Sequence, residues 1–168
     1  MNIKTKNLLL LLLLLLCLTG CGKNAELEEY QTNMSTFISN VSDIKSRMDS
    51  IDTASPDAVY SLLGCLDELQ VQFEILSEMN VPSKFAGIES LADEASSYMT
   101  EAVLLYHEIF EAAEYDEAAA DIAEENYDRA MKRLSYISSL LQGKLPDDEN
   151  LIITEEEVLD FEPITESE

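Results

Sequence analysis

Residues 27–51 read LEEYQTNMSTFISNVSDIKSRMDSI, with apolar side chains at alternating spacings of three and four. The residues at these spacings are Leu27, Tyr30, Met34, Phe37, Val41, Ile44, Met48 and Ile51. Because an α-helix turns once in about 3.6 residues, this heptad-like pattern lines the side chains along one face. Helices with such a seam pack against each other at a shallow angle. We expect a helix that starts near residue 25, with Asn24 as its N-cap, and stops at residues 52–55.

The same spacing recurs in three further stretches. In the second helix Ser55 is expected as the N-cap and Pro56 as the first helical residue. Its seam consists of Val59, Leu62, Leu66, Leu69, Phe73 and Leu76, widened by Leu63. Pro82 ends this helix, and Ser83 is expected to cap the third. The third seam consists of Ile88, Ala92, Ala95, Met99, Ala102, Tyr106, Ile109 and Ala113, flanked by Phe85, Leu91, Val103 and Phe110. The fourth consists of Ala123, Tyr127, Ala130, Leu134, Ile137 and Leu141, and Gly143 suits its C-cap.

The boundary between the third and fourth helices is open, because no Gly or Pro lies between Ala113 and Ala123. One helix over residues 83–142 would be about 90 Å long, and its far half would need a second molecule to cover it. Asp116 would also place a charge in the seam. We therefore expect a turn near residues 115–116 with Asp116 as N-cap, which gives an all-α, up-down-up-down four-helix bundle over residues 25–145. A single long helix that dimerises is the alternative.

The first twenty residues have a different character. Lys4 and Lys6 precede an apolar run over residues 8–18 that is leucine except for Cys17. This run is about half as long as a transmembrane helix requires, and its length is typical of the apolar region of a secretory signal peptide.

Leu18-Thr19-Gly20-Cys21 follows that run and resembles the lipobox of bacterial lipoproteins. The resemblance implies transfer of diacylglycerol to the Cys21 thiol and then cleavage after Gly20. We expect no cofactor other than this covalent lipid. Residues 1–20 would then be a signal peptide and residues 21–24 a lipidated N-terminus and short tether.

The body of the chain loosely resembles small helical-bundle lipoproteins of uncharacterised function, with a likeness that lies in the lipobox, the short tether, the Val81-Pro82 helix junction and Ala-rich later helices. The expected location is extracytoplasmic, on the outer leaflet of the cell membrane, or on an outer membrane where the cell has one. Stable anchoring requires two acyl chains, because one chain binds a membrane only weakly.

The charge of the chain restricts its partners. Its formal net charge is −24, and loss of Lys4 and Lys6 with the leader would make it −26. Nucleic acid is excluded, because phosphate binding needs a surface rich in Lys and Arg. Direct adsorption to anionic lipids is also disfavoured, so the acyl chains would hold the protein on the membrane. Cationic proteins, peptides and divalent ions remain candidate partners, and a monomer or small oligomer is expected.

Residues 146–168 contain ten acidic residues and no Lys or Arg, which predicts a mostly disordered acidic tail. Its apolar residues are Leu151, Ile152, Ile153, Val158, Leu159 and Phe161 among others. They form either a docking peptide that orders on a partner or a few contacts with the chain's own bundle.

Residues able to carry chemistry are few. His107 is the only histidine, and Glu111 four residues later makes the pair a weak metal candidate. No second histidine or glycine-rich phosphate loop accompanies it, and Cys65 is the only cysteine outside residues 1–21. We therefore expect no enzyme. The sequence favours a non-catalytic protein- or peptide-interaction module of the cell envelope. The alternative is a solute- or cation-binding lipoprotein associated with a transporter, with His107 and the nearby acids as ligands.

Overall fold

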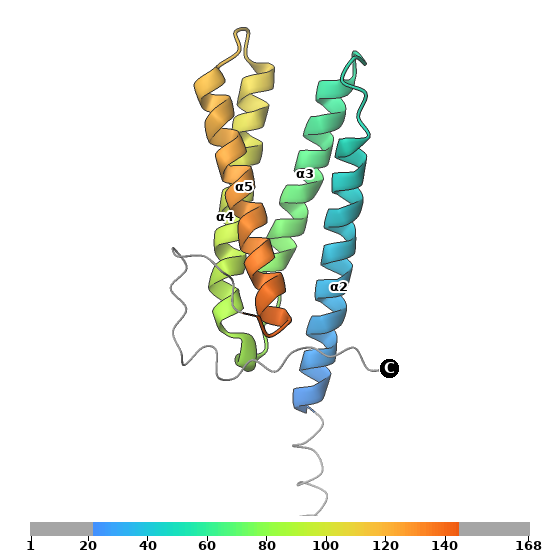
Figure 1. Ribbon diagram of the computed structural model, residues 1–168, viewed down its shortest axis with the longest axis vertical. Helices are drawn as coiled ribbons and strands as arrows, with labels where there is room; N and C mark the ends of the chain where they lie inside the picture. Colours follow the sequence, from blue (N-terminus) through green and yellow to red (C-terminus); the bar gives the residue numbers. More distant parts are fainter. Residues whose placement is uncertain (1–21, 145–168) are drawn as a thin grey trace, which may run out of the picture.

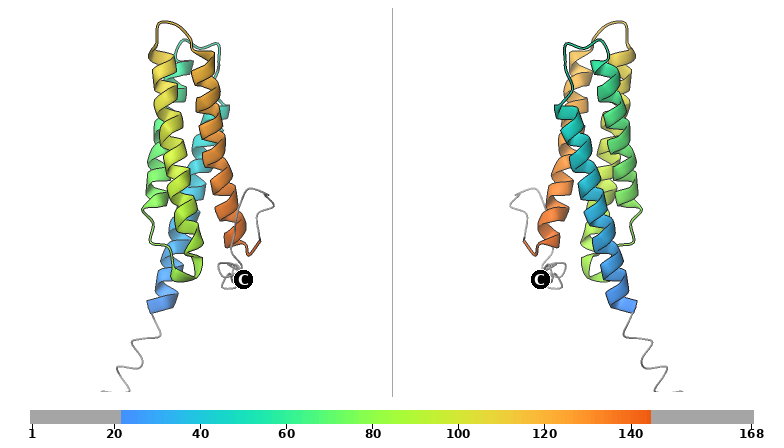
Figure 2. Two further views of the ribbon diagram at one scale, coloured as in Figure 1. Left: turned by 90° about the vertical axis from the view of Figure 1, so that its left-hand side faces the viewer. Right: turned by 90° about the vertical axis from the view of Figure 1, so that its right-hand side faces the viewer.

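A computed structural model describes residues 22–144, with side chains from residue 25 onward, and shows an all-α bundle of four helices (Figure 1). The helices are α2 (Gly22–Asp49), α3 (Ala58–Ser77), α4 (Gly87–Glu111) and α5 (Glu117–Leu141), with a short 3₁₀ helix, η1 (Ser83–Phe85), before α4. Successive helices run in opposite directions along one long axis (Figure 2). The predicted up-down-up-down arrangement is therefore confirmed.

The four seams meet in one core. Its largest fully buried side chains are Tyr30, Phe37, Phe73, Phe85, Leu66, Leu69, Leu76, Ile88, Met99 and Ile137. On α4 and α5 the seam is rich in buried alanines, which are Ala92, Ala95, Ala102, Ala123 and Ala130. These small side chains let the two backbones approach closely, and α4 with α5 is the most extensively packed helix pair. Within residues 22–144, no helix has the length and apolarity needed to cross a membrane.

Two predicted helix ends are confirmed in detail. The Asp116 carboxylate accepts a hydrogen bond from the Ala119 N–H at 3.1 Å, so α5 has its own N-cap. A single helix over residues 83–142 is therefore wrong. At the other end of α5, Gly143 has φ of 69°. Its N–H donates to the Leu140 carbonyl at 2.8 Å, and the Lys144 N–H donates to the Ser139 carbonyl at 2.9 Å, which together form a Schellman cap.

Three predicted helix starts are wrong by a few residues. α2 begins at Gly22, so Asn24 lies inside its first turn. α3 begins at Ala58, because Ser55 instead accepts from the Asp57 N–H at 3.3 Å and forms a turn before the helix. Ser83 opens the 3₁₀ helix instead of capping α4. A cap contributes only about 1 kcal/mol, so the neighbouring chain easily moves a helix start by a turn.

The seams also extend less far than the spacing predicts. Val59 is 42% exposed, because it lies in the first turn of α3 at the end of the bundle. Ala113 follows the end of α4 and is exposed. Several outer positions are only partly buried, namely Leu27, Met48, Leu62, Leu63, Tyr106, Tyr127 and Leu134. Near the ends of the bundle fewer neighbouring side chains cover the apolar face of a helix, although the heptad-like spacing continues in the sequence.

Candidate functional site

Two predicted functional elements, the lipid-attachment site and the acidic tail, lie outside the described bundle. Cys21 and the cleavage point after Gly20 lie outside the described residues. The apolar tail residues Leu151, Ile152, Ile153, Val158, Leu159 and Phe161 also lie outside them. These assignments stay predictions.

His107 lies between two carboxylates. Its Nε2 is 2.7 Å from Oδ1 of Asp67 on α3, and its Nδ1 is 3.7 Å from Oε1 of Glu111 on its own helix. The hydrogen bond to Asp67 is the main cause that raises the pKa of His107 above its ordinary value, and Glu111 adds to the effect. Each ring nitrogen thus faces one acid, and the two acids do not converge on a common point.

The described part of the chain contains no group of three or more His, Cys, Asp or Glu side chains that could hold a metal ion. Cys65 is a free thiol buried on α3 among the core residues. A buried thiol packs as a small apolar side chain. The geometry around His107 therefore describes an interhelical ion pair between α3 and α4.

We expect the Asp67–His107 pair to stabilise the bundle only at lower pH. The folded state binds the His107 proton more tightly than the unfolded chain, because the folded pKa is raised. The stabilisation is fully present below the unfolded pKa of about 6.5 and is lost as the pH rises through the folded pKa. Asp67→Asn should lower the free energy of unfolding by less than about 1 kcal/mol at pH 5.5, since both side chains are partly exposed, and leave it unchanged near pH 9.

Urea unfolding followed by circular dichroism at the two pH values measures this difference. Asp93→Asn, at an exposed position on α4, is the control for removal of one acidic charge. Equal losses for Asp67→Asn at both pH values would show that the ion pair does not carry the effect.

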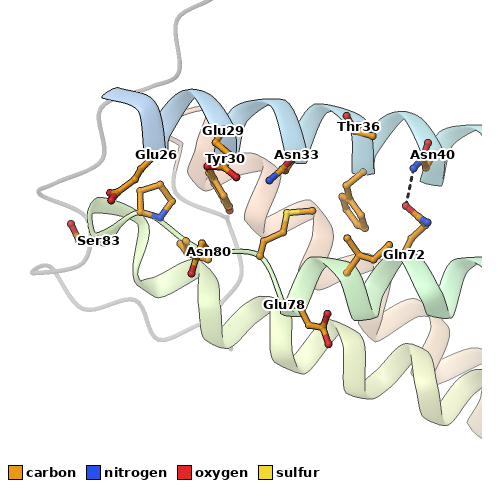
Figure 3. A pocket seen from close by; sticks show the side chains of 15 residues that line it. Glu26, Glu29, Tyr30, Asn33, Thr36, Asn40, Gln72, Glu78, Asn80 and Ser83 are labelled. Atoms are coloured by element: carbon orange, nitrogen blue, oxygen red, sulfur yellow. Dashed lines mark hydrogen bonds between the residues drawn. The ribbon is translucent and has the colours of Figure 1, made fainter. Parts of the chain in front are cut away.

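A groove of about 770 Å³ runs between α2 and the segment that joins α3 to α4 (Figure 3). We call it the amide-lined groove. It is lined by Glu26, Glu29, Tyr30, Asn33, Thr36, Phe37, Asn40, Gln72, Ile75, Glu78, Met79, Asn80, Val81, Pro82 and Ser83. The wall opposite α2 consists of the end of α3, with Gln72 and Ile75, and of the segment 78–83, in which Pro82 is extended with φ of −57° and ψ of 143°. One wall is therefore a single helix, and the other is a helix end followed by a non-helical segment.

Side-chain amides are the characteristic polar groups of this groove. Asn40 on α2 donates through Nδ2 to Oε1 of Gln72 on α3 at 2.9 Å, which ties the two helices at one end. Asn33 and Asn80 lie further along the opposite walls (Figure 3). An amide both donates and accepts hydrogen bonds, so it can pair with either group of a peptide bond.

Tyr30 forms part of the groove floor and has an unusual hydroxyl. The residue is only 2% exposed, and its ring lies 6.1 Å from that of Phe85. Its hydroxyl oxygen is buried without a hydrogen-bond partner in the described part of the chain. Burial raises the pKa of Tyr30 to about 12, so the hydroxyl keeps its proton at neutral pH and remains a donor. Buried polar groups are almost always paired, which makes this hydroxyl an exception that calls for an acceptor.

The sequence analysis did not predict this groove, although the sequence contains some of the features that form it. Tyr30 and Phe37 were expected as seam residues, and the seam accounts for their burial. Asn33, Asn40 and Asn80 lie off the seam and look like solvated positions. Only Pro82, which prevents helix at Val81, marks a stretch of extended backbone that could form a wall.

Comparison with protein-family models, with curated proteins and with solved structures gives no match to this chain.

Proposed function

We propose that this chain is a lipid-anchored extracytoplasmic lipoprotein whose bundle binds a protein or peptide of the cell envelope without catalysing a reaction. The observation that supports binding is the amide-lined groove with the unpartnered Tyr30 hydroxyl in its floor. The lipobox resemblance of Leu18-Thr19-Gly20-Cys21 supports the anchor. The proposal therefore rests on two independent features, one in the sequence and one in the bundle.

The position of the groove relative to the anchor supports this proposal. α2 begins at Gly22, directly after Cys21, and Glu26 already lines the groove. At about 1.5 Å per helical residue, Glu26 lies less than 10 Å along α2 from the residue that would carry the lipid. The groove would then open close to the membrane surface, where a segment of a membrane protein could reach it.

The alternative, a solute- or cation-binding lipoprotein that serves a transporter, has no specific observation in its favour within residues 22–144. His107 and Glu111, its candidate ligands, form an ion-paired cluster with Asp67. These three side chains do not form a group that could hold a metal ion, and the described residues contain no other such group.

Photo-crosslinking in living cells tests the proposed function. A photoreactive phenylalanine analogue at Asn33, an exposed position on the groove wall, should give a discrete covalent adduct. The same analogue at Glu101, exposed on α4 and remote from the groove, is the matched control. Reciprocal crosslinking from the partner identified by mass spectrometry should return to the groove. Identical adducts from both positions, or none from Asn33, would contradict a binding role for the groove.

A further inference from the structure

The amide-lined groove has a strongly one-sided charge. Glu26 and Glu29 on α2 and Glu78 after α3 line it, and no Lys, Arg or His is among its described lining residues. Glu26 and Glu78 come from opposite sides of the groove (Figure 3). A hollow with one sign of charge concentrates counter-charged ligands, and the net charge of −24 strengthens the field. An acidic cluster alone selects no ligand, so the floor of the groove has to be considered with it.

The floor calls for a ligand that accepts a hydrogen bond. Within the described part of the chain the Tyr30 hydroxyl is a buried donor without an acceptor, and Tyr30 extends from α2 toward the segment that carries Asn80 (Figure 3). Because the hydroxyl oxygen is itself covered, a peptide carbonyl reaches it only after the side chains above it shift. Asn33 and Asn80 lie on the walls and could pair with the adjacent N–H and C=O groups. An unpaired buried hydroxyl destabilises the free protein, and a ligand that pairs it recovers part of that loss.

One other kind of occupant fits less well. The chain's own residues 146–168 carry ten acidic residues, which the three groove carboxylates would repel. An extended, positively charged peptide matches the negative charge of the groove, and its carbonyl groups can accept the hydrogen bond from the Tyr30 hydroxyl.

We propose that the amide-lined groove binds an extended peptide segment rich in Lys or Arg. The Tyr30 hydroxyl donates to a carbonyl of that segment, and Glu26, Glu29 and Glu78 face its basic side chains. This inference rests on the proposed function and adds the chemical class of the partner.

Peptide binding to the full chain in detergent micelles tests the inference. The probes are three fluorescein-labelled octapeptides in which alanine alternates with lysine, with glutamate or with serine. The lysine peptide should bind saturably, and its affinity should fall as salt rises, because screening weakens exposed charge pairs. The glutamate peptide should not bind, and the serine peptide should bind at least tenfold more weakly than the lysine peptide.

Two groove variants and one control locate the binding site. Tyr30→Phe removes only the hydroxyl and should weaken lysine-peptide binding about fivefold, the value of one hydrogen bond. The triple variant Glu26→Gln, Glu29→Gln, Glu78→Gln should weaken it at least tenfold. The control Glu101→Gln, Glu108→Gln, Glu114→Gln removes three exposed charges outside the groove and should change affinity by less than twofold.

The Tyr30→Phe variant also separates binding from folding. Because the hydroxyl has no partner among the described residues, its removal should leave the thermal midpoint unchanged or raise it. Loss of binding at full stability therefore supports the inference. Equal affinity of the groove variants and the control, absence of lysine-peptide binding, or tighter binding of the glutamate peptide would overturn it. The photo-crosslinking experiment at Asn33 tests the proposed function independently of these peptide measurements.

Discussion

Replacing Phe73 with alanine should lower the free energy of unfolding by about 3–5 kcal/mol, the usual cost of deleting a buried aromatic ring. Phe73 on α3 is fully buried, and its ring packs edge-on against that of Phe37 on α2 at 5.8 Å and 82°. Single domains are stable by only about 5–15 kcal/mol, so one substitution would remove a large share of the total.

The loss should be greatest for the attachment of α2. Among the helix pairs of the described bundle, α2 packs mainly on α3, whereas α4 and α5 pack closely on each other. A cavity between Phe37 and Phe73 therefore weakens the main contact that holds α2. Hydrogen exchange should become faster in α2 before it does in α4 and α5.

Equilibrium urea unfolding, followed by circular dichroism, measures the effect. Val71→Ala is the matched control, because Val71 lies on the same helix two residues away and is 50% exposed. Surface substitutions usually change stability by less than about 0.5 kcal/mol. Similar losses for the two variants would show that the Phe37–Phe73 contact is not central to the core.

The sequence predicts the helices of this fold well, because helical periodicity follows from backbone geometry alone. Every fully buried large side chain on α3 and α4 belongs to a predicted seam or its flanks, including Leu66, Leu69 and Met99. Asp116 and Gly143 were also predictable, since each acts through hydrogen bonds within a few residues of itself. Ser55 and Ser83 have the same chemistry but do not cap α-helices, because η1 and the turn before α3 take up those residues.

Sites built across helices were much less predictable. Glu111 was expected beside His107 from its spacing of four, but the closer partner is Asp67, forty residues earlier in the chain. Asp67 and His107 meet only because α3 and α4 place them at the same level along the bundle axis. The amide-lined groove depends in the same way on how the start of α2 lies against the end of α3 and Pro82. A sequence pattern gives the face of a helix, but it does not give the neighbour at each level.

Replacing Cys21 with serine should abolish lipid attachment completely and leave the leader in place. The proposed anchor is a thioether to the Cys21 sulfur, which a hydroxyl does not replace in this reaction. Because the lipobox resemblance implies that lipid transfer precedes cleavage, the variant should retain residues 1–20 ahead of position 21. Intact-mass measurement should therefore find the full 168 residues without an acyl group, whereas the unaltered chain should begin at a diacylglyceryl Cys21.

Cys17→Ser is the matched control, because Cys17 lies in the same leader but outside the lipobox. It should be processed and lipidated like the unaltered chain, with fatty-acid label on the product. The bundle should fold in both variants, because neither cysteine belongs to the described core. A mature product of the Cys21→Ser chain that starts at position 21, or an unaltered chain without acyl mass, would remove the anchor. The groove would then no longer be held beside a membrane, and its partner would have to be sought in solution.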